Sequence, residues 1–373
     1  MSWFLDDLTA KAAERERAGL TRRLVARSGD DLLDLAGNDY LGLLTSPEVI
    51  LGATTATRTY GGGAGASRLV TGTLPIHDEL ESALAELLQA PSALVFSTGY
   101  HANLGAVTAL ADDSTLIVSD AHIHASLIDA GRLSRARVAV ARHNDTADVA
   151  RLLSARSKPK AMILVESIYS VLGDQAPLAE LEELARRHDA ILLIDEAHGV
   201  GVAGNHGQGL TASLGLSQAE HVVVTVTLSK SLAAQGGAVL GHPAVREHLV
   251  NTARPFIYDT GLAPAAVGAA LAATAVLRHH PDLAYRVRTN AAVLAESCGV
   301  QPPAGAVLSV PMAGPREAQA AVAVCAERGI RIGCFRPPST PDGISRLRIT
   351  AHAHHTPDEM ARAAKVLSEV TGA

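Results

Sequence analysis

A lysine set among hydroxyl residues directly follows an apolar run near the middle of the chain. The run is Val222–Val226, and Thr227, Ser229 and Lys230 come after it. A lysine at the end of a buried strand is costly to desolvate, and desolvation lowers its pKa and leaves a neutral amine that can form an imine with an aldehyde cofactor. Because nearby hydroxyls can hold a phosphate, the pattern indicates pyridoxal phosphate. The alternative is a lysine whose ammonium group reaches solvent.

An acid and a histidine follow a second apolar run, Ile191–Ile194. Such a run is typical of a buried parallel strand, which delivers Asp195 to the edge of the sheet where ligands of α/β folds bind. A buried carboxylate there can keep the pyridine nitrogen of pyridoxal phosphate protonated, as electron withdrawal requires. His198, on the following turn, can reach the phenolic oxygen of the same ring. On its own, a histidine at this place is more often structural.

Two other motifs compete for the same part of the chain. Residues 195–198 spell Asp-Glu-Ala-His, the acidic box of some helicases, but that box works with a phosphate loop of the form G-x-x-x-x-G-K-S/T, which the sequence lacks. Residues 199–204 fit the letters G-x-G-x-x-G of dinucleotide binding. The glycine-rich polar residues 205–209 that follow do not open an amphipathic helix, so the required context is missing.

Two further predicted strands end in polar residues. Gly99 and Tyr100 follow the strand-like segment Ala93–Phe96 and open a helical pattern, so their backbone amides are expected at a helix N-terminus, which binds phosphate. His122 and His124 form an H-x-H pair on one side of an extended segment. The pair could bind a metal, but no third ligand of suitable spacing accompanies it, so stacking of one ring on a planar cofactor is favoured.

These residues resemble the α-oxoamine synthases, pyridoxal-phosphate enzymes with the fold of aspartate aminotransferase. The likeness extends over nearly the whole chain, from residues 38–43 (Asn-Asp-Tyr-Leu-Gly-Leu) through residues 65–72 (Gly-Ala-Ser-Arg-Leu-Val-Thr-Gly) to residues 336–339 (Arg-Pro-Pro-Ser). It implies fold type I, an α/β architecture. The last two segments are most similar to the branch that condenses L-alanine with a pimeloyl thioester, on coenzyme A or a carrier protein, in biotin biosynthesis.

The resemblance implies roles for single residues in cofactor chemistry. Lys230 matches the lysine that binds the cofactor aldehyde, Asp195 the partner of the pyridinium nitrogen, and His198 the partner of the phenolic oxygen. His124 matches the histidine that stacks on the ring and completes the predicted catalytic set. The remaining implied cofactor contacts are Gly99, Tyr100, Ser170, Thr227 and, from a second subunit, Thr260.

The resemblance also implies a site for the substrates. Arg348 matches the arginine that grips the amino-acid carboxylate, a task that suits a planar guanidinium. Arg346 lies two residues earlier on the same predicted strand, so both can face one way, and the sequence leaves the choice open. The other predicted substrate-binding residues are Arg22, Arg23, Asn38 and Ser339. An N-terminal arginine steers the thioester in the family, although a solvated basic helix end explains the arginine pair equally well.

Alternating strand and helix patterns organise the chain. Residues 1–35 are expected to form an N-terminal helical arm that can pack on a partner, residues 36–263 a large cofactor-binding domain, and residues 264–373 a small C-terminal α/β domain. A mostly parallel sheet is predicted from the strands Ala93–Phe96, Thr115–Val118, Met162–Val165, Ile191–Ile194 and Val222–Val226. The small domain is expected to contain strands at 306–310, 330–332 and 346–350, and helices near 315–329 and 356–371.

Composition bounds the function classes. The 373 residues are 47% hydrophobic and carry a net charge of −6, so the chain can bury a large core and is a poor candidate for nucleic-acid binding. Three cysteines show neither metal-ligand spacing nor an even count, which fits a reducing cytoplasm and predicts no metal site. The first residues lack the apolar core of an export signal, and no membrane segment of roughly 20 residues is visible. A homodimer with shared active sites is expected from the family.

Two other functions remain open. Another pyridoxal enzyme of the same fold, such as an aminotransferase or a 2-amino-3-ketobutyrate ligase, would need the same cofactor residues. A binding or scaffold protein that has kept the fold without the cofactor would purify colourless and would gain no absorbance band on addition of pyridoxal phosphate.

Overall fold

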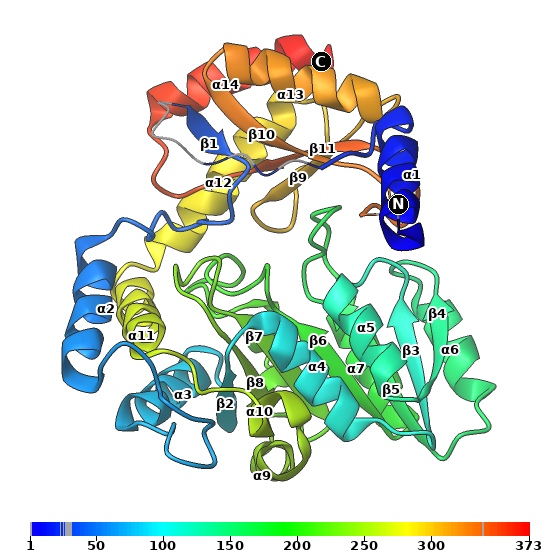
Figure 1. Ribbon diagram of the computed structural model, residues 1–373, viewed down its shortest axis with the longest axis vertical. Helices are drawn as coiled ribbons and strands as arrows, with labels where there is room; N and C mark the ends of the chain where they lie inside the picture. The colour runs from blue at the N-terminus through cyan, green and yellow to red at the C-terminus, as the bar shows by residue number, and fades with distance from the viewer. Residues whose placement is uncertain (1, 23, 25, 27–31, 338) are drawn as a thin grey trace.

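The computed structural model describes residues 2–22, 24, 26, 32–337 and 339–373, which form two lobes, each built on one sheet (Figure 1). The larger sheet has seven strands in the order β2-β8-β7-β6-β5-β3-β4. Their bounds are Ser92–Phe96 for β2, Thr115–Asp120 for β3, Arg137–Ala141 for β4, Lys160–Glu166 for β5, Ala190–Asp195 for β6, Val222–Thr227 for β7 and Gly237–Gly241 for β8.

Strands β7, β6, β5, β3 and β4 run parallel to one another. Strand β8 is antiparallel to both of its neighbours, β2 and β7. The central strands β5, β6 and β7 are largely buried because aliphatic and β-branched side chains pack on both faces of the sheet. Since parallel strands end at a common edge, Asp195 at the end of β6 and Thr227 at the end of β7 leave the sheet side by side. The predicted mostly parallel sheet is confirmed.

Helices cover both faces of the large sheet, and each face has its own apolar core. One core joins α4 (Gly99–Leu110), α5 (Ala125–Leu133), α9 (Pro243–Thr252) and α10 (Arg254–Ile257) to the sheet. The other core contains α3 (Pro75–Leu87), α6 (Thr146–Ser154) and α7 (Leu178–Arg187), together with α2 (Pro47–Tyr60) and α11 (Pro264–His279). Leu193 of β6 points to the first core and Leu192 and Ile194 to the second, as the two-residue period of a strand requires. Two short elements, α8 (Leu210–Ser213) and a 3-10 helix at Leu216–Gln218, precede β7.

All five strands predicted for the large sheet are present, each with one to three residues more than expected. Two strands were missed for different reasons. The edge strand β4 is mostly exposed, so it lacks a buried apolar run. The strand β8 begins and ends with glycine, which is more typical of a turn than of a strand, but the strand is buried between β2 and β7.

The smaller lobe is a four-stranded sheet in the order β1-β10-β11-β9, with bounds Leu33–Leu35, Ile330–Phe335, Arg346–Thr350 and Val307–Pro311. Side chains of this sheet form one core with α12 (Asp282–Ser297), α13 (Pro315–Glu327) and α14 (Pro357–Thr371). Strand β11 matches its predicted range, and β10 extends three residues beyond it. Strand β11 of this sheet carries Arg346 and Arg348.

The division into arm, large domain and small domain stays a prediction, and two packing observations bear on its boundaries. Strand β1, inside the predicted arm, pairs with β10 of the small sheet. Helix α11, inside the predicted small domain, packs on α2 and contributes to the core of the large lobe. We propose on this basis that the small domain includes β1 and begins in sequence after α11.

The predicted N-terminal helix is α1 (Trp3–Arg17), and none of its side chains is buried in this chain. Its apolar side chains Trp3, Phe4, Leu5 and Leu8 are all exposed. Among the residues that the structure describes, no helix combines the length and apolar character needed to cross a membrane.

Candidate active site

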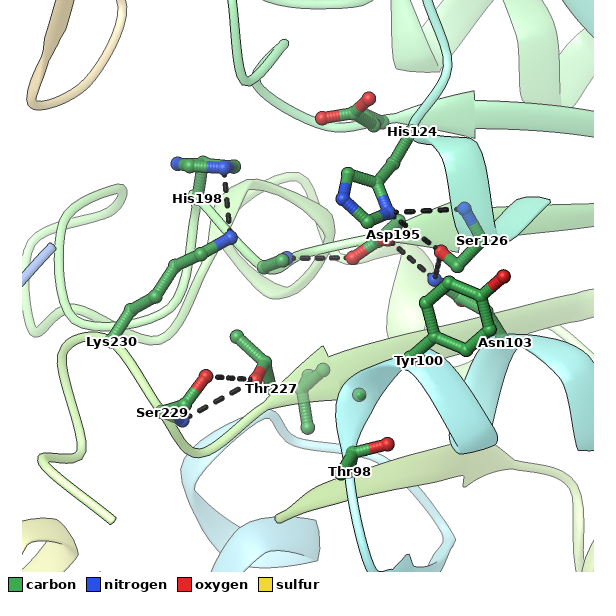
Figure 2. Close-up of a pocket in the computed structure, with 14 residues that line it drawn as sticks. Thr98, Tyr100, Asn103, His124, Ser126, Asp195, His198, Thr227, Ser229 and Lys230 are labelled. Atoms are coloured by element: carbon green, nitrogen blue, oxygen red, sulfur yellow. Dashed lines mark hydrogen bonds between the residues drawn. The ribbon is translucent and has the colours of Figure 1, made fainter. Parts of the chain in front are cut away.

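A cavity of about 260 Å³ lies at the carboxyl ends of β6 and β7, beside the N-terminus of α4 (Figure 2). The two segments that first indicated cofactor chemistry, those around Asp195 and Lys230, both contribute side chains to its wall. The predicted cofactor residues that line the cavity are Gly99, Tyr100, His124, Asp195, His198, Thr227 and Lys230. The fold therefore brings together residues that lie up to 131 positions apart in the sequence (230 − 99 = 131).

The amine of Lys230 begins a hydrogen-bonded relay that leaves the cavity. Nζ of Lys230 lies 2.8 Å from Nε2 of His198, and Nδ1 of His198 lies 2.7 Å from the hydroxyl of Tyr40. The Tyr40 hydroxyl in turn donates to Oδ1 of Asn38 at 3.1 Å. All of these contacts are satisfied when a neutral His198 carries its proton on Nδ1, so that Nε2 accepts from the lysine.

Burial sets the protonation of this relay. It lowers the pKa of Lys230 to about 8, against the raising effect of the Asp195 and Glu166 charges. Burial also holds the pKa of His198 well below its ordinary value, and the positive charges of Lys230 and Arg348 act in the same direction. The site therefore presents an amine with a large neutral fraction near pH 8 and a neutral imidazole beside it.

A second hydrogen-bonded chain holds Asp195 at the other side of the cavity. Its Oδ2 accepts from the side-chain amide of Asn103 at 2.8 Å, and its Oδ1 accepts from the backbone amide of Ala197 at 2.9 Å. The Asn103 amide also donates to the Ser126 hydroxyl at 2.9 Å, and that hydroxyl lies 2.8 Å from Nδ1 of His124 (Figure 2). The carboxylate and the imidazole at the cavity wall are thus fixed relative to each other.

The remaining wall is suited to a phosphate. The Thr98 hydroxyl caps α4 by accepting from the amide of His101 at 3.0 Å, and the free amides at this helix N-terminus favour an anion. A Cβ at position 99 would lie 2.8 Å from Cβ of Thr227, so glycine is needed for the helix to approach β7 so closely. The hydroxyls of Thr227 and Ser229, 2.7 Å apart, border the same space.

These observations fit pyridoxal phosphate. The cavity offers an amine with a lowered pKa, a buried carboxylate held by two N–H donors, an imidazole open to the cavity, and an anion-binding helix terminus next to hydroxyls. Of the H-x-H pair, His124 borders the cavity, whereas the His122 ring packs against His143, with ring centres 4.5 Å apart. The structure thus supports the choice of His124 over His122.

The two arginines of β11 have different surroundings. Nε of Arg348 donates to the carbonyl of Ser170 at 2.9 Å, and its Nη2 donates to Oδ1 of Asn38 at 3.1 Å, so Arg348 joins the relay that begins at Lys230. Arg346 instead forms an ion pair with Asp342. Arg348 is therefore the arginine coupled to the cavity, although neither it nor Ser170 belongs to the cavity wall.

Two residues predicted to bind substrate, Arg22 and Ser339, meet in a second, smaller cavity of about 130 Å³. Nη2 of Arg22 donates to the Ser339 hydroxyl at 3.0 Å, across 317 positions of sequence, and Arg336 also lines this cavity. Arg23 lies outside the described residues, so its predicted role remains a prediction.

Thr260 is exposed and lies outside the first cavity of this chain. Its backbone amide donates to Oδ1 of the preceding Asp259 at 2.9 Å. Oδ2 of Asp259 is held by the Ser97 hydroxyl and by Nδ1 of His101, which lies 3.2 Å away. The segment is thus anchored beside the N-terminus of α4, and the predicted contact of Thr260 across subunits remains a prediction.

Four residues of the site were not predicted from the sequence. Tyr40 lies inside a motif that carried the resemblance and Asn103 in the helix that begins at Gly99, but nothing in their spacing showed that they would link His198 to Asn38 or support Asp195. Ser126 bridges Asn103 and His124. Glu166, at the end of β5, also lines the cavity, and burial and the Asp195 charge raise its pKa to about 8. Its Oε1 is buried and has no hydrogen-bond partner among the described residues.

Comparison with known proteins agrees with this geometry. A family model described as aminotransferase class I and II matches residues 30–367. The 8-amino-7-oxononanoate synthase of Mycolicibacterium gilvum is 55% identical to the chain over 359 residues, which cover 96% of this chain and 94% of that protein.

Solved structures show the same fold over nearly the whole chain. A serine palmitoyltransferase from S. paucimobilis, with bound pyridoxal phosphate and myriocin, is similar with a TM-score of 0.90 and 29% identity, covering 98% of this chain and 96% of that chain. The 8-amino-7-oxononanoate synthase of Francisella tularensis is similar with a TM-score of 0.78 and 26% identity, covering 91% of this chain and 97% of that chain.

Proposed function

Because this chain belongs to the α-oxoamine synthases, pyridoxal-phosphate enzymes of fold type I, in the branch of 8-amino-7-oxononanoate synthase, we propose that its substrates are L-alanine and a pimeloyl thioester. The products would be 8-amino-7-oxononanoate, carbon dioxide and the free thiol, a step of biotin biosynthesis. The observation that carries the proposal is the 55% identity with one such synthase over 96% of the chain, since the cofactor geometry alone is shared with many pyridoxal enzymes.

The cofactor and Lys230 have different roles in removing the Cα proton of the amino acid. When bound, pyridoxal phosphate draws electrons from the Cα of the amino acid and so makes the Cα proton acidic. Lys230 is the base that removes this proton, since a pKa of about 8 leaves much of its amine neutral near that pH. Nε2 of His198, 2.8 Å from the amine, then accepts a hydrogen bond from the protonated lysine.

The other residues bind and orient. Asp195 would pair with the ring nitrogen of the cofactor, His124 would face the ring, and the terminus of α4 with Thr227 would hold the phosphate. Arg348 binds the carboxylate of the amino acid, for which its planar fork and its place at the end of the relay suit it. With the carboxylate held there, Arg348 and Lys230 would together restrict the geometry of proton removal.

We propose that the smaller cavity receives the carrier end of the acyl thioester. Arg22 and Arg336 give it positive charge, and Ser339 adds a hydroxyl. Coenzyme A and a carrier-protein prosthetic group both bear phosphate, which such a cavity suits.

We further propose a cytoplasmic homodimer with shared active sites. The exposed apolar side chains of α1, among them Trp3 at 80% exposure, are available to pack on a second copy. The exposed Thr260 is likewise available to reach the phosphate site of that copy.

The test of this function is a substrate matrix. The purified holoenzyme is given L-alanine, glycine or L-serine, each with pimeloyl-coenzyme A, acetyl-coenzyme A or a pimeloyl carrier protein, and thiol and carbon dioxide release are measured. We expect the highest kcat/KM with L-alanine and a pimeloyl thioester. A preference for glycine with acetyl-coenzyme A would identify a 2-amino-3-ketobutyrate ligase instead, and amino transfer to a 2-oxo acid without thiol release would identify an aminotransferase.

The assignment of Arg348 predicts a specific defect in amino-acid binding. Arg348→Lys keeps the charge but loses the two-pronged hydrogen bonding, so the KM for L-alanine should rise about 10- to 100-fold, equivalent to about 1.5–3 kcal/mol for hydrogen bonds to a charged group. The kcat should change less. Arg346→Lys is the matched control on the same strand and should leave KM within about threefold of the unmodified protein. Equal rises in KM for the two variants would contradict the assignment.

A further inference from the structure

Three histidines converge on the loop that joins β11 to α14, on the far side of Tyr40 from the proposed active site. They are His352, His354 and His355. One ring nitrogen of each lies within 4.8 Å of one ring nitrogen of each of the other two. The rings of His352 and His355 are stacked with centres 5.0 Å apart, and the ring of His354 packs edge-on to both. No role in the proposed reaction uses them.

Two of these histidines are buried with unsatisfied nitrogens. His352 and His355 are 2% and 5% exposed, and Nδ1 of each has no hydrogen-bond partner among the described residues. Leaving a buried polar atom unpaired costs about 1–3 kcal/mol.

The surrounding backbone makes room for the third ring. A Cβ at position 42 would lie 2.3 Å from Nδ1 of His354, and Gly42 has a φ of +73°, which side chains rarely adopt. His354 is exposed, so the cluster is open to solvent on one side. Two buried donors and one exposed donor would leave a fourth position accessible to water.

We propose that His352, His354 and His355 bind one divalent transition-metal ion of the class that prefers imidazole, such as Zn²⁺. With metal–nitrogen bonds of roughly 2.0–2.1 Å, tetrahedral donors lie about 3.4 Å apart, so separations of up to 4.8 Å require the nitrogens to approach one another by up to about 1.4 Å when the ion binds. The alternative is a stack of three neutral imidazoles with no ion, which leaves both buried Nδ1 atoms unpaired.

The ion would fix a loop that is joined to the active site. The amide of Ala353, between the proposed ligands, donates to the carbonyl of Tyr40 at 2.7 Å, and the Tyr40 hydroxyl contacts His198. The carbonyl of His352 accepts from the Asn290 amide at 2.8 Å. Metal binding is thus expected to stiffen the support of Tyr40 without touching the reacting atoms.

The test is metal binding by tag-free holoenzyme. Equilibrium dialysis against Zn²⁺, buffered by a competing chelator, should give one tightly bound ion per chain. His354→Ala, an exposed position chosen to spare the fold, should weaken binding at least tenfold, and His355→Gln should do the same. The matched control is His279→Ala combined with His280→Ala, a pair of exposed neighbouring histidines at the end of α11, which should leave the affinity unchanged.

A spectroscopic measurement makes the outcome independent of folding of the variants. Co²⁺ bound to the unmodified holoenzyme should give the intense visible bands of a four-coordinate ion, at wavelengths beyond the cofactor band, and excess Zn²⁺ should abolish them. Absence of these bands, binding that is unchanged in His354→Ala, or loss of binding in the control pair would each overturn the proposal. Cofactor absorbance recorded in parallel shows whether the active site is intact, so failure of the metal site and failure of the proposed function are distinguishable.

Discussion

Replacing Lys230 with alanine should lower kcat by at least about 10³-fold and remove the visible absorbance that arises from covalent attachment of the cofactor. The expected loss is large because one amine has two tasks, cofactor attachment and Cα proton removal, and the cavity offers no second lysine among its lining residues. The measurement is single-turnover release of thiol from pimeloyl-coenzyme A in the presence of L-alanine, together with an absorbance spectrum of the purified variant.

The control for this variant is Lys160→Ala. Lys160 is exposed at the start of β5, where it forms an ion pair with Asp112, whereas the cavity lies at the other ends of the parallel strands. Its removal should therefore change neither the rate nor the spectrum. Turnover by Lys230→Ala within tenfold of the unmodified protein would refute the assignment. An unchanged rate with a lost absorbance band would instead mean that Lys230 attaches the cofactor but is not the base.

Asp195→Asn should reduce kcat/KM by about 10²- to 10³-fold, the usual effect of removing one preorganised electrostatic partner. Asparagine keeps the size of the side chain, and its single oxygen can still accept a hydrogen bond from Ala197 or Asn103, but it cannot carry the negative charge that keeps the pyridine nitrogen protonated. The variant should therefore bind the cofactor and fold normally while losing rate. Steady-state kinetics and cofactor titration measure the two effects separately.

Rescue by an altered cofactor distinguishes this role from a structural one. A pyridoxal phosphate methylated on the ring nitrogen is cationic without a proton. It should therefore raise the rate of Asp195→Asn at least tenfold above the rate of that variant with the ordinary cofactor, and give no gain in the unmodified protein. Asp112→Asn, the exposed partner of Lys160, is the matched control and should behave as the unmodified protein. Full activity of Asp195→Asn with the ordinary cofactor would contradict the proposed pairing.

The sequence predicts the central sheet and the core of the site well because both depend on local patterns. Buried parallel strands are apolar throughout, so β6 and β7 and the polar residues that end them can be recognised from their own letters. The helix N-terminus at Gly99 is recognisable for the same reason, since a strand, a small residue and a helical pattern follow one another. Roles taken from the resemblance, such as those of Thr260 and Arg23, stay predictions.

What the sequence did not predict depends on contacts between distant segments. Tyr40 reaches His198 across 158 positions, and Asn103 reaches Asp195 across 92, so neither link leaves a local pattern. The choice between Arg346 and Arg348 was open because both lie on one strand, and only the presence of Asp342 beside one and of Asn38 beside the other separates them. The histidine cluster of the loop after β11 was not recognised because the burial of His352 and His355, which sets them apart from a polar surface loop, comes from packing.

The chain of contacts from Arg348 through Asn38, Tyr40 and His198 to Lys230 joins the two lobes of the molecule. The Arg348 charge lowers the proton affinity of both His198 and Lys230. When the amino acid arrives and its carboxylate neutralises the guanidinium, this repulsion weakens, so both nitrogens hold a proton more strongly. Docking of the correct ligand at one end thereby raises the proton affinity of the amine at the other, and an amine that lacks a carboxylate would leave that affinity unchanged.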